Sequence, residues 1–348
     1  MSERGYFPPL TEESAGIRDL MLIYTNYGVN WNVKDALSYV AYLDNNANQN
    51  KIKDWFFDSY LFLALKSNND RAFDSPARAT PAIKEDWQWW LDDLFRPNAQ
   101  ISVFNEAYKI ANQHLPEKRK GKIYIMIPNP MVQITEFGEV DGENLDFSSK
   151  DATEATRQRF KAVEWFVETF LEMFEKANLD QLELAGFYWL EEMIHANPGE
   201  DDLVRQVSKY LHDKGFKFCW IPWFRAKGHD RWEEVGFDFC IHQPNYMFRA
   251  DVPISRFADV TSDAKKYYQG IEIEAFGKVF ESKEWRERFY DYLRAGVTYG
   301  YMKDVIHGYY QDTHVFAISA YSDDPEIREI YDNVYKFVQG TYTETLQV

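Results

Sequence analysis

Two glutamates stand two positions apart in the apolar stretch "QGIEIEAFGK", residues 269–278. Side chains alternate along a strand, so Glu272 and Glu274 share one face of this run while Ile271 and Ile273 share the other. A carboxylate turned into a protein interior costs free energy unless it is paired, hydrogen-bonded or solvated in a cleft. Glu274, nearer the predicted strand end, is the better catalytic candidate. Glu272 is either a second functional carboxyl or part of a packing network.

A second pair of acids follows the aromatic residues of "GFYWLEEMIHAN", residues 186–197. Glu192 has the strand parity of Tyr188 and Glu191 that of Trp189, and parity alone does not decide which pair points inward. We favour Glu192. Either acid could instead stabilise the start of a following helix through the helix dipole. Glycoside hydrolysis needs two carboxyl groups, one protonated and one ionised, on opposite sides of the scissile bond, and the two acidic pairs fit that need.

Polar and aromatic side chains gather at the ends of the other predicted strands. Besides Tyr188 and Trp189, the residues predicted to bind substrate are Tyr24, Asn26, Asp58, Asn129, Gln133, Trp223, Arg225, Asp238, Gln243, Asn245, Tyr246 and Tyr321. A sugar ring stacks on aromatic faces, while its hydroxyl groups pair with amide, carboxyl and guanidinium groups. Trp189, Trp223 and Tyr246 are expected to be exposed at strand ends. The seven histidines lack metal-site spacing, so we predict neither a metal site nor a cofactor.

Short apolar runs alternate with stretches of helical spacing along most of the chain. The runs that predict strands are residues 19–25, 56–65, 122–130, 182–192, 216–224, 235–245, 270–276 and 315–322. Parallel strands joined by helices favour a (β/α)8 barrel, the TIM-barrel fold, in which active sites lie at the carboxyl ends of the strands. The alternative, an open doubly wound sheet, would place a glycine-rich loop after the first strand, where the sequence has "YTNYGVNWN" instead.

We expect a single barrel domain over residues 1–348, interrupted by an excursion at 66–121. Helices are predicted within it at 84–95 and 101–115, and residues 67–82 are expected to cross the top of the barrel. In the barrel, the apolar face of the 270–276 strand must meet the helices, which turns Glu272 and Glu274 inward.

The formal net charge of −17 argues against a nucleic-acid partner, because phosphate binding needs clustered basic residues. A neutral ligand fits better, and no apolar run reaches the length of a membrane span. Hydrophobic residues make up 45% of the chain, enough for a large core. The two cysteines, Cys219 and Cys240, fall in predicted core strands and are expected to be plain buried residues.

A long ordered string of motifs carries a family resemblance. It includes "IYTNYG", "FFDSYLFLAL", "GFYWLEE", "WIPWF", "GFDFCIHQPNY", "GIEIE" and "YDNVYKFVQGTY", and runs from about Asp19 to Tyr342. The chain resembles a bacterial family known only as a domain of unknown function, seen mostly in secreted proteins of polysaccharide-degrading bacteria. That family is similar in turn to the clan-A glycoside hydrolases.

The resemblance implies a retaining glycosidase with Glu192, or Glu191 in another register, as acid/base and Glu274 as nucleophile. The chain departs from the clan in having Glu-Glu where the clan has Asn-Glu after the fourth strand. The resemblance also implies an extracytoplasmic protein, secreted, periplasmic or lipid-anchored, whose signal segment is absent from this chain.

The sequence therefore predicts a glycoside hydrolase with a carbohydrate substrate. The alternative is a glycan-binding barrel without catalytic activity. A third possibility, a phosphate-using or metal-dependent barrel enzyme, would require an ordered anion or cation at the rim.

Overall fold

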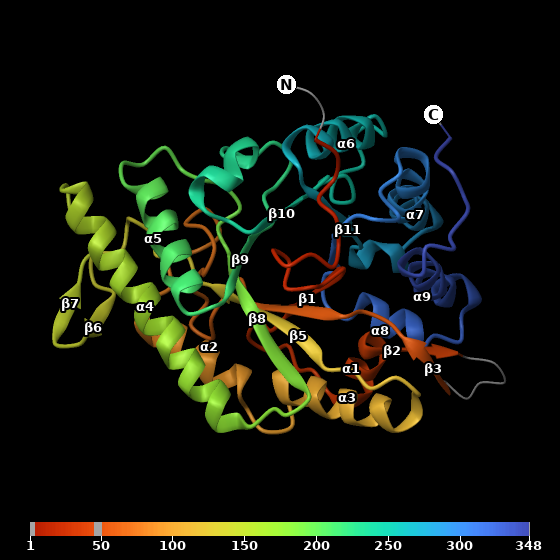
Figure 1. Ribbon diagram of the computed structural model, residues 1–348, viewed down its shortest axis with the longest axis horizontal. Coiled ribbons are helices and arrows are strands. Elements are labelled where there is room, and N and C mark those ends of the chain that lie inside the picture. The colour runs from red at the N-terminus through yellow and green to blue at the C-terminus, as the bar shows by residue number, and fades with distance from the viewer. Residues whose placement is uncertain (1–3, 45–50, 348) are drawn as a thin grey trace.

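A closed barrel of parallel strands forms the centre of the computed structural model, which describes residues 4–44 and 51–347 (Figure 1). Within that part of the chain, eight strands close the barrel in the order β1-β12-β11-β10-β9-β8-β5-β4. They are β1 (Asp19–Tyr24), β4 (Ser59–Leu63), β5 (Gly121–Ile127), β8 (Leu182–Trp189), β9 (Lys217–Trp220), β10 (Phe239–His242), β11 (Gly270–Glu274) and β12 (His307–Tyr310). The predicted (β/α)8 fold is confirmed.

Helices surround the barrel because each has one apolar stripe to bury. They are α1 (Val33–Val40), α2 (Lys84–Leu94), α3 (Ile101–His114), α4 (Ala152–Ala177), α5 (Glu200–Asp213), η2 (His229–Val235), α6 (Arg256–Tyr267), η3 (Gly277–Phe280), α7 (Lys283–Tyr299), α8 (Val315–Ala320) and α9 (Pro325–Val338). In α4, Phe166 and Phe170 are fully buried. Asp151 begins α4 by accepting the backbone N–H of Thr153, which fixes where that helix starts.

Seven of the predicted strands are confirmed, and the eighth is wrong. Residues 315–322 contain helix α8, and the last barrel strand is the earlier segment β12. Helix α8 is buried over most of its surface, so its sequence lacks the polar face that would distinguish it from a strand. Tyr321, expected after the eighth strand, instead follows α8 and donates its hydroxyl hydrogen bond to the Lys34 carbonyl at 2.6 Å.

The excursion between β4 and β5 contains the two predicted helices, α2 and α3. Two small hairpins were not anticipated: β2 (Ala41–Asp44) with β3 (Lys51–Trp55), and β6 (Gly138–Val140) with β7 (Glu143–Leu145). The segment 74–78 of the excursion reaches the mouth of the barrel, where it lines a cavity.

Strand β11 presents its glutamates to the barrel interior, as the alternation predicts. Ile271 and Ile273 are fully buried on the other face, where α6 and α7 pack against the strand. Glu272 pairs in register with Gly308 of β12, and a Cβ added at Gly308 would lie 3.6 Å from Cγ of Glu272 and 3.3 Å from Ile241. The contact with Glu272 would be an ordinary one, and the tighter contact would be with Ile241.

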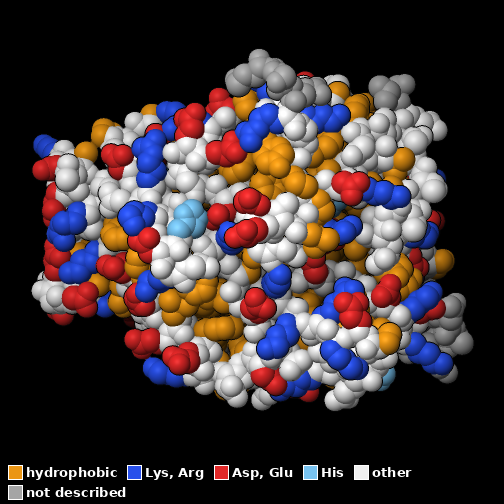
Figure 2. All heavy atoms as spheres, in the orientation of Figure 1, with side chains coloured by type: hydrophobic (Ala, Val, Ile, Leu, Met, Phe, Trp, Pro, Cys, Tyr) orange, Lys and Arg blue, Asp and Glu red, His pale blue; other side chains and the backbone are white. Residues whose placement is uncertain are grey.

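Acidic and basic side chains are interspersed over the face of the molecule shown in Figure 2. That mixture fits a surface that does not concentrate positive charge for a nucleic acid. Among the described residues, no helix combines the length and apolarity needed to cross a membrane.

Candidate active site

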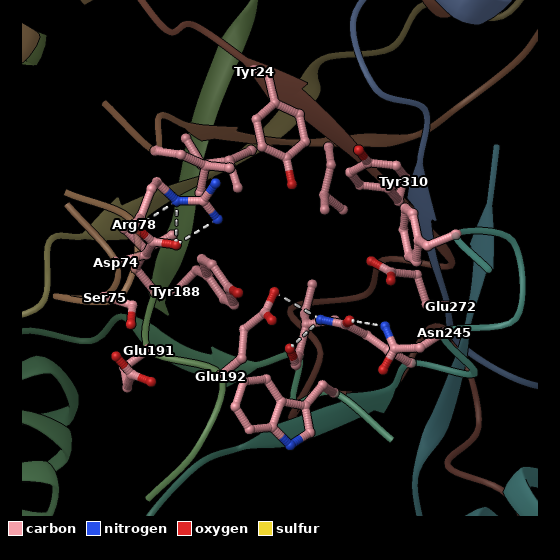
Figure 3. A pocket seen from close by; sticks show the side chains of 18 of the residues that line it. Tyr24, Asp74, Ser75, Arg78, Tyr188, Glu191, Glu192, Asn245, Glu272 and Tyr310 are labelled. Carbon is pink, nitrogen blue, oxygen red and sulfur yellow. Dashed lines mark hydrogen bonds and ion pairs between the residues drawn. The ribbon is translucent and has the colours of Figure 1, made fainter. Parts of the chain in front are cut away.

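A cavity of about 560 Å³ opens at the carboxyl ends of the barrel strands (Figure 3). Its walls come from several strand ends: Tyr24 ends β1, Tyr188 lies near the end of β8, and Tyr310 ends β12. The 74–78 segment closes one side with Asp74 and Arg78. This is the position where barrels of this fold hold their active sites.

Glu192 enters the cavity from the segment after β8 (Figure 3). Its Oε1 accepts a hydrogen bond of 2.8 Å from Nε2 of Gln243, whose Oε1 accepts a 2.8 Å bond from Nδ2 of Asn245. Burial raises the pKa of Glu192 to about 7, against the lowering effect of the Gln243 bond. A carboxyl with this pKa exchanges its proton near neutral pH, as a general acid must.

Glu272 lies on the other side of the cavity and faces Glu192 (Figure 3). It is 2% exposed, and its Oε1 receives no hydrogen bond from any donor in the described part of the chain. Its nearest charged neighbour on the strand is the carboxyl of Glu274, close enough for the two groups to share a proton. Burial, followed by the charges of Glu274 and Glu192, raises the pKa of Glu272 well above its ordinary value. Two hydrogen-bonded carboxyl groups require a proton between them.

Glu274 lies behind Glu272, fully buried and outside the cavity lining. It accepts the backbone N–H of Asn245 at 3.0 Å, the backbone N–H of Tyr246 at 3.2 Å, the Asn245 side-chain amide at 3.2 Å and the hydroxyl of Tyr292. Burial raises its pKa to about 7, although these donors favour the ionised form. The expectation that Glu274 lies nearer the mouth than Glu272 is wrong, because the loop after β10 folds over its carboxyl.

Glu191 also reaches the cavity wall, but its partners lie in a smaller neighbouring cavity of about 160 Å³. It accepts a 2.6 Å hydrogen bond from Nδ2 of Asn129 and lies 3.4 Å from Nε2 of His195. Burial raises the pKa of Glu191, while contact with Glu191 raises that of His195. Asn129 and Gln133 line the smaller cavity and not the main one.

The main cavity combines aromatic walls with polar groups. Of the predicted binding residues, it brings together Tyr24, Tyr188, Trp223, Gln243 and Asn245. Trp223 is 40% exposed, which leaves a ring face available for stacking.

Several lining residues were missed by sequence reasoning, among them Asp74, Arg78, Phe248 and Tyr310. Tyr310 escaped notice because its strand was misplaced. Asp74 and Arg78 form an ion pair at i,i+4 spacing, with 2.8 and 2.9 Å bonds from Nε of Arg78 to both carboxylate oxygens. The i,i+4 spacing of these opposite charges was the feature of the excursion sequence that could have indicated the pair.

Asp58 and Asp238 lie at the opposite, amino-terminal end of the barrel, so their predicted roles in substrate binding are wrong. Asp58 directly precedes β4 and accepts the backbone N–H groups of Arg18 at 2.9 Å and Asp19 at 3.1 Å. Asp238 directly precedes β10 and accepts the backbone N–H of Phe218 at 2.7 Å. Both carboxyl groups satisfy backbone donors where strands begin.

Trp189 and Tyr246 are buried outside the cavity, contrary to prediction. Because Tyr188 points into the barrel, Trp189 must point out of it, and its ring packs edge-on against Phe218 at 6.2 Å between centroids. Tyr246 is 4% exposed, and its hydroxyl donates a 3.0 Å hydrogen bond to Asp291. Its contribution to the site is the backbone N–H that Glu274 accepts.

Asn26 and Arg225 lie near the barrel mouth but outside the main cavity. The Asn26 side chain accepts the backbone N–H of Leu65 at 2.6 Å, which ties the loop after β1 to the one after β4. Arg225 is engaged at the surface by Asp263, at 2.6 Å.

The fold and the site thus define a TIM barrel with a carboxyl-rich, aromatic-lined cavity at the catalytic end. Residues 19–336 match the model of the family described as "Domain of unknown function (DUF4855)", and the chain belongs to that family. The resemblance noted in the sequence is confirmed. No curated protein matches the chain.

Solved structures similar to the chain share its barrel fold. A GH5-4 broad specificity endoglucanase from an uncultured bacterium is 8% identical with a TM-score of 0.46, covering 96% of this chain and 97% of that one. The GH18 chitinase ChiB of Flavobacterium johnsoniae is 10% identical with a TM-score of 0.43, covering 92% and 94%. A D-psicose 3-epimerase is 13% identical with a TM-score of 0.41, covering 92% and 99%. Likenesses this distant carry no argument about activity.

Within the described residues, no group of three or more His, Cys, Asp or Glu side chains is arranged to hold a metal ion. The two cysteines are buried and unpaired with each other, as expected.

Proposed function

We propose that the protein hydrolyses glycosidic bonds with retention of anomeric configuration. The observation that carries the proposal is the placement of Glu192 and Glu272 on opposite sides of one aromatic-lined cavity (Figure 3). They come from the fourth and seventh barrel strands, and two carboxyl groups flanking the scissile bond are what glycoside hydrolysis requires.

Glu192 acts as acid/base. Its pKa of about 7 keeps it protonated on the acidic side of neutrality, and the amide of Gln243 holds its orientation. In the first step Glu192 gives its proton to the leaving oxygen.

Glu272 acts as nucleophile, with Glu274 as its proton acceptor. Glu272 forms a bond to the anomeric carbon as the bond to the leaving oxygen breaks, and the proton of Glu272 passes to Glu274. Four donors stabilise Glu274 in the ionised form, ready to receive that proton. Water then cleaves the glycosyl ester, Glu192 takes the proton of that water, and Glu274 returns its proton to Glu272. This division of roles differs from the expectation that Glu274 attacks directly.

Carbohydrate recognition is assigned to the walls of the cavity. The exposed ring of Trp223 offers a stacking face, and Asn245 and Gln243 offer amide groups to sugar hydroxyls. We also propose an extracytoplasmic location, where polysaccharides are met.

The test is a screen for reducing ends released from plant, fungal and host glycans, using the wild type and three variants. Glu192→Gln and Glu272→Gln should each lower kcat by about 10²-fold or more. Glu183→Gln is the matched control, since Glu183 is exposed near the start of the same strand that leads to Glu192. The first sugar anomer released, observed by NMR, should have the configuration of the substrate.

Two outcomes would contradict the proposal. If the wild type binds glycans without turnover, the protein is a glycan-binding barrel. If turnover occurs and survives both cavity variants, the reaction is carried by other residues.

A further inference from the structure

The main cavity holds more negative groups than the chain neutralises. Of its four carboxyl residues, Asp74 is paired with Arg78 and Glu191 with His195. Glu192 has an amide partner, and Glu272 has another carboxyl. Arg78 is the single Lys or Arg lining the cavity in the described part of the chain, and Asp74 already occupies its guanidinium.

Glu272 is the strongest sign that something is missing from this site. It is 2% exposed, points into the cavity, and receives no hydrogen bond from a described donor (Figure 3). An acceptor buried without a donor is costly, so native structures rarely retain one without a ligand or a functional reason. A cationic donor placed beside Glu272 would satisfy it and offset its neighbouring charges.

Aromatic rings surround the same point. Tyr24, Tyr188 and Tyr310 line the same cavity as Glu272 (Figure 3). Tyrosine faces attract an ammonium group by cation–π interaction, and carboxyl groups accept its hydrogen bonds. The described residues offer no cluster of metal ligands here, which favours an organic cation over a metal ion.

We propose that the sugar unit held in this cavity carries a protonated amine, as in a 2-amino-2-deoxyhexose, with the ammonium group bound to Glu272. This inference rests on the proposed function and names its substrate class. Anionic sugars, such as uronic acids, are excluded by the same charges.

The binding test uses Glu192→Gln protein, in which hydrolysis is slowed and Glu272 is intact. Three tetrasaccharides of equal length are compared by isothermal titration calorimetry at pH 6 in 0.15 M salt: β-1,4-linked glucosamine, its fully N-acetylated form, and β-1,4-linked glucose. We expect the glucosamine tetramer to bind at least tenfold more tightly than the other two.

Two controls separate specific recognition from attraction to the acidic protein. Adding Glu272→Gln should bring the three affinities within about twofold of one another, whereas adding Glu183→Gln should leave the preference intact.

The inference is overturned if the three tetramers bind equally, if the glucosamine tetramer does not bind, or if its preference survives Glu272→Gln. The proposed function is judged separately, by wild-type turnover in the glycan screen. Hydrolysis of neutral glycans without an amine preference would support the glycosidase proposal and refute the amino-sugar substrate.

Discussion

The hydroxyl of Tyr292 offers a direct test of the proton transfer between Glu272 and Glu274. It donates to Glu274 and accepts the backbone N–H groups of Tyr246 at 3.0 Å and Met247 at 2.9 Å. Tyr292→Phe removes these bonds and leaves the rest of the cavity unchanged. The backbone N–H of Tyr246 keeps Glu274 as an acceptor, but that of Met247 has none.

The size of the effect follows from the charge on Glu274. A hydrogen bond to a charged group contributes about 1.5–3 kcal/mol, and one pH unit corresponds to about 1.4 kcal/mol. Losing the Tyr292 bond weakens the ionised form, so the pKa of Glu274 should rise by roughly 1 to 2 units from its value of about 7. The mechanism needs Glu274 ionised, so kcat/KM measured near pH 5, below the pKa of both carboxyl groups, should fall by about 10- to 100-fold.

In contrast, kcat/KM near pH 10, above both pKa values, should be unchanged, because there it depends on the fraction of Glu192 that still holds its proton, and the variant does not alter that pKa of about 7. Stability should fall as well, by about 1–3 kcal/mol for the orphaned N–H of Met247, measured by urea unfolding. Tyr290→Phe is the matched control: Tyr290 lies on the same helix, is buried, and its hydroxyl has no partner among the described residues. It should change neither kcat/KM at pH 5 nor the stability. A kcat/KM at pH 5 that is unchanged in Tyr292→Phe, or that falls equally in Tyr290→Phe, would refute the proton-acceptor role.

Three further predictions concern single side chains. Glu192→Gln should stabilise the protein by up to about 3 kcal/mol at pH 8 and by little below pH 4.5. The pKa of Glu192 is raised from 4.5 to about 7 in the folded protein, so the free energy of unfolding of the wild type falls as the pH rises from 4.5 to 7, and that of the variant does not. Urea unfolding at pH 4 and pH 8 measures the difference. Trp223→Ala should weaken glycan binding by about 2- to 12-fold, seen by calorimetry, since it removes an exposed stacking ring worth about 0.5–1.5 kcal/mol. Asp58→Asn should lower stability without changing kcat, because Asp58 accepts hydrogen bonds from backbone N–H groups at the amino end of the barrel. A fall in kcat would indicate that Asp58 does take part in the active site.

The barrel was predictable because its strands and helices differ in period. Apolar and polar residues alternate over 270–276, whereas apolar residues recur at three- and four-residue intervals over 160–174. Each pattern gives the element one buried face. Residues 315–322 have no such period, because helix α8 is apolar and buried over most of its surface. The true last strand, "HGYY", is too short and too polar to stand out.

The site was predictable only as far as strand parity reaches. Parity placed Tyr188 and Glu192 on one face once the barrel was assumed, and both line the cavity. Parity does not locate the two ends of a strand to within a few positions. Asp58 and Asp238 were therefore assigned to the carboxyl end of the barrel, although both lie at the amino end. Nor could it reveal that the loop after β10 covers Glu274, because that contact joins residues distant in sequence.

The two glutamates of β11 become chemically distinct through their surroundings. Glu274 accepts hydrogen bonds from four donors of Asn245, Tyr246 and Tyr292. Among the described residues, Oε1 of Glu272 has no donor, and the neighbouring carboxyl of Glu272 is that of Glu274. The same residue type at two inward positions therefore provides a carboxyl that holds a proton toward the cavity and a carboxylate that can take it away. A strand with a single inward glutamate could not do both, since an isolated buried carboxyl in this position would stay protonated and have no group to accept its proton.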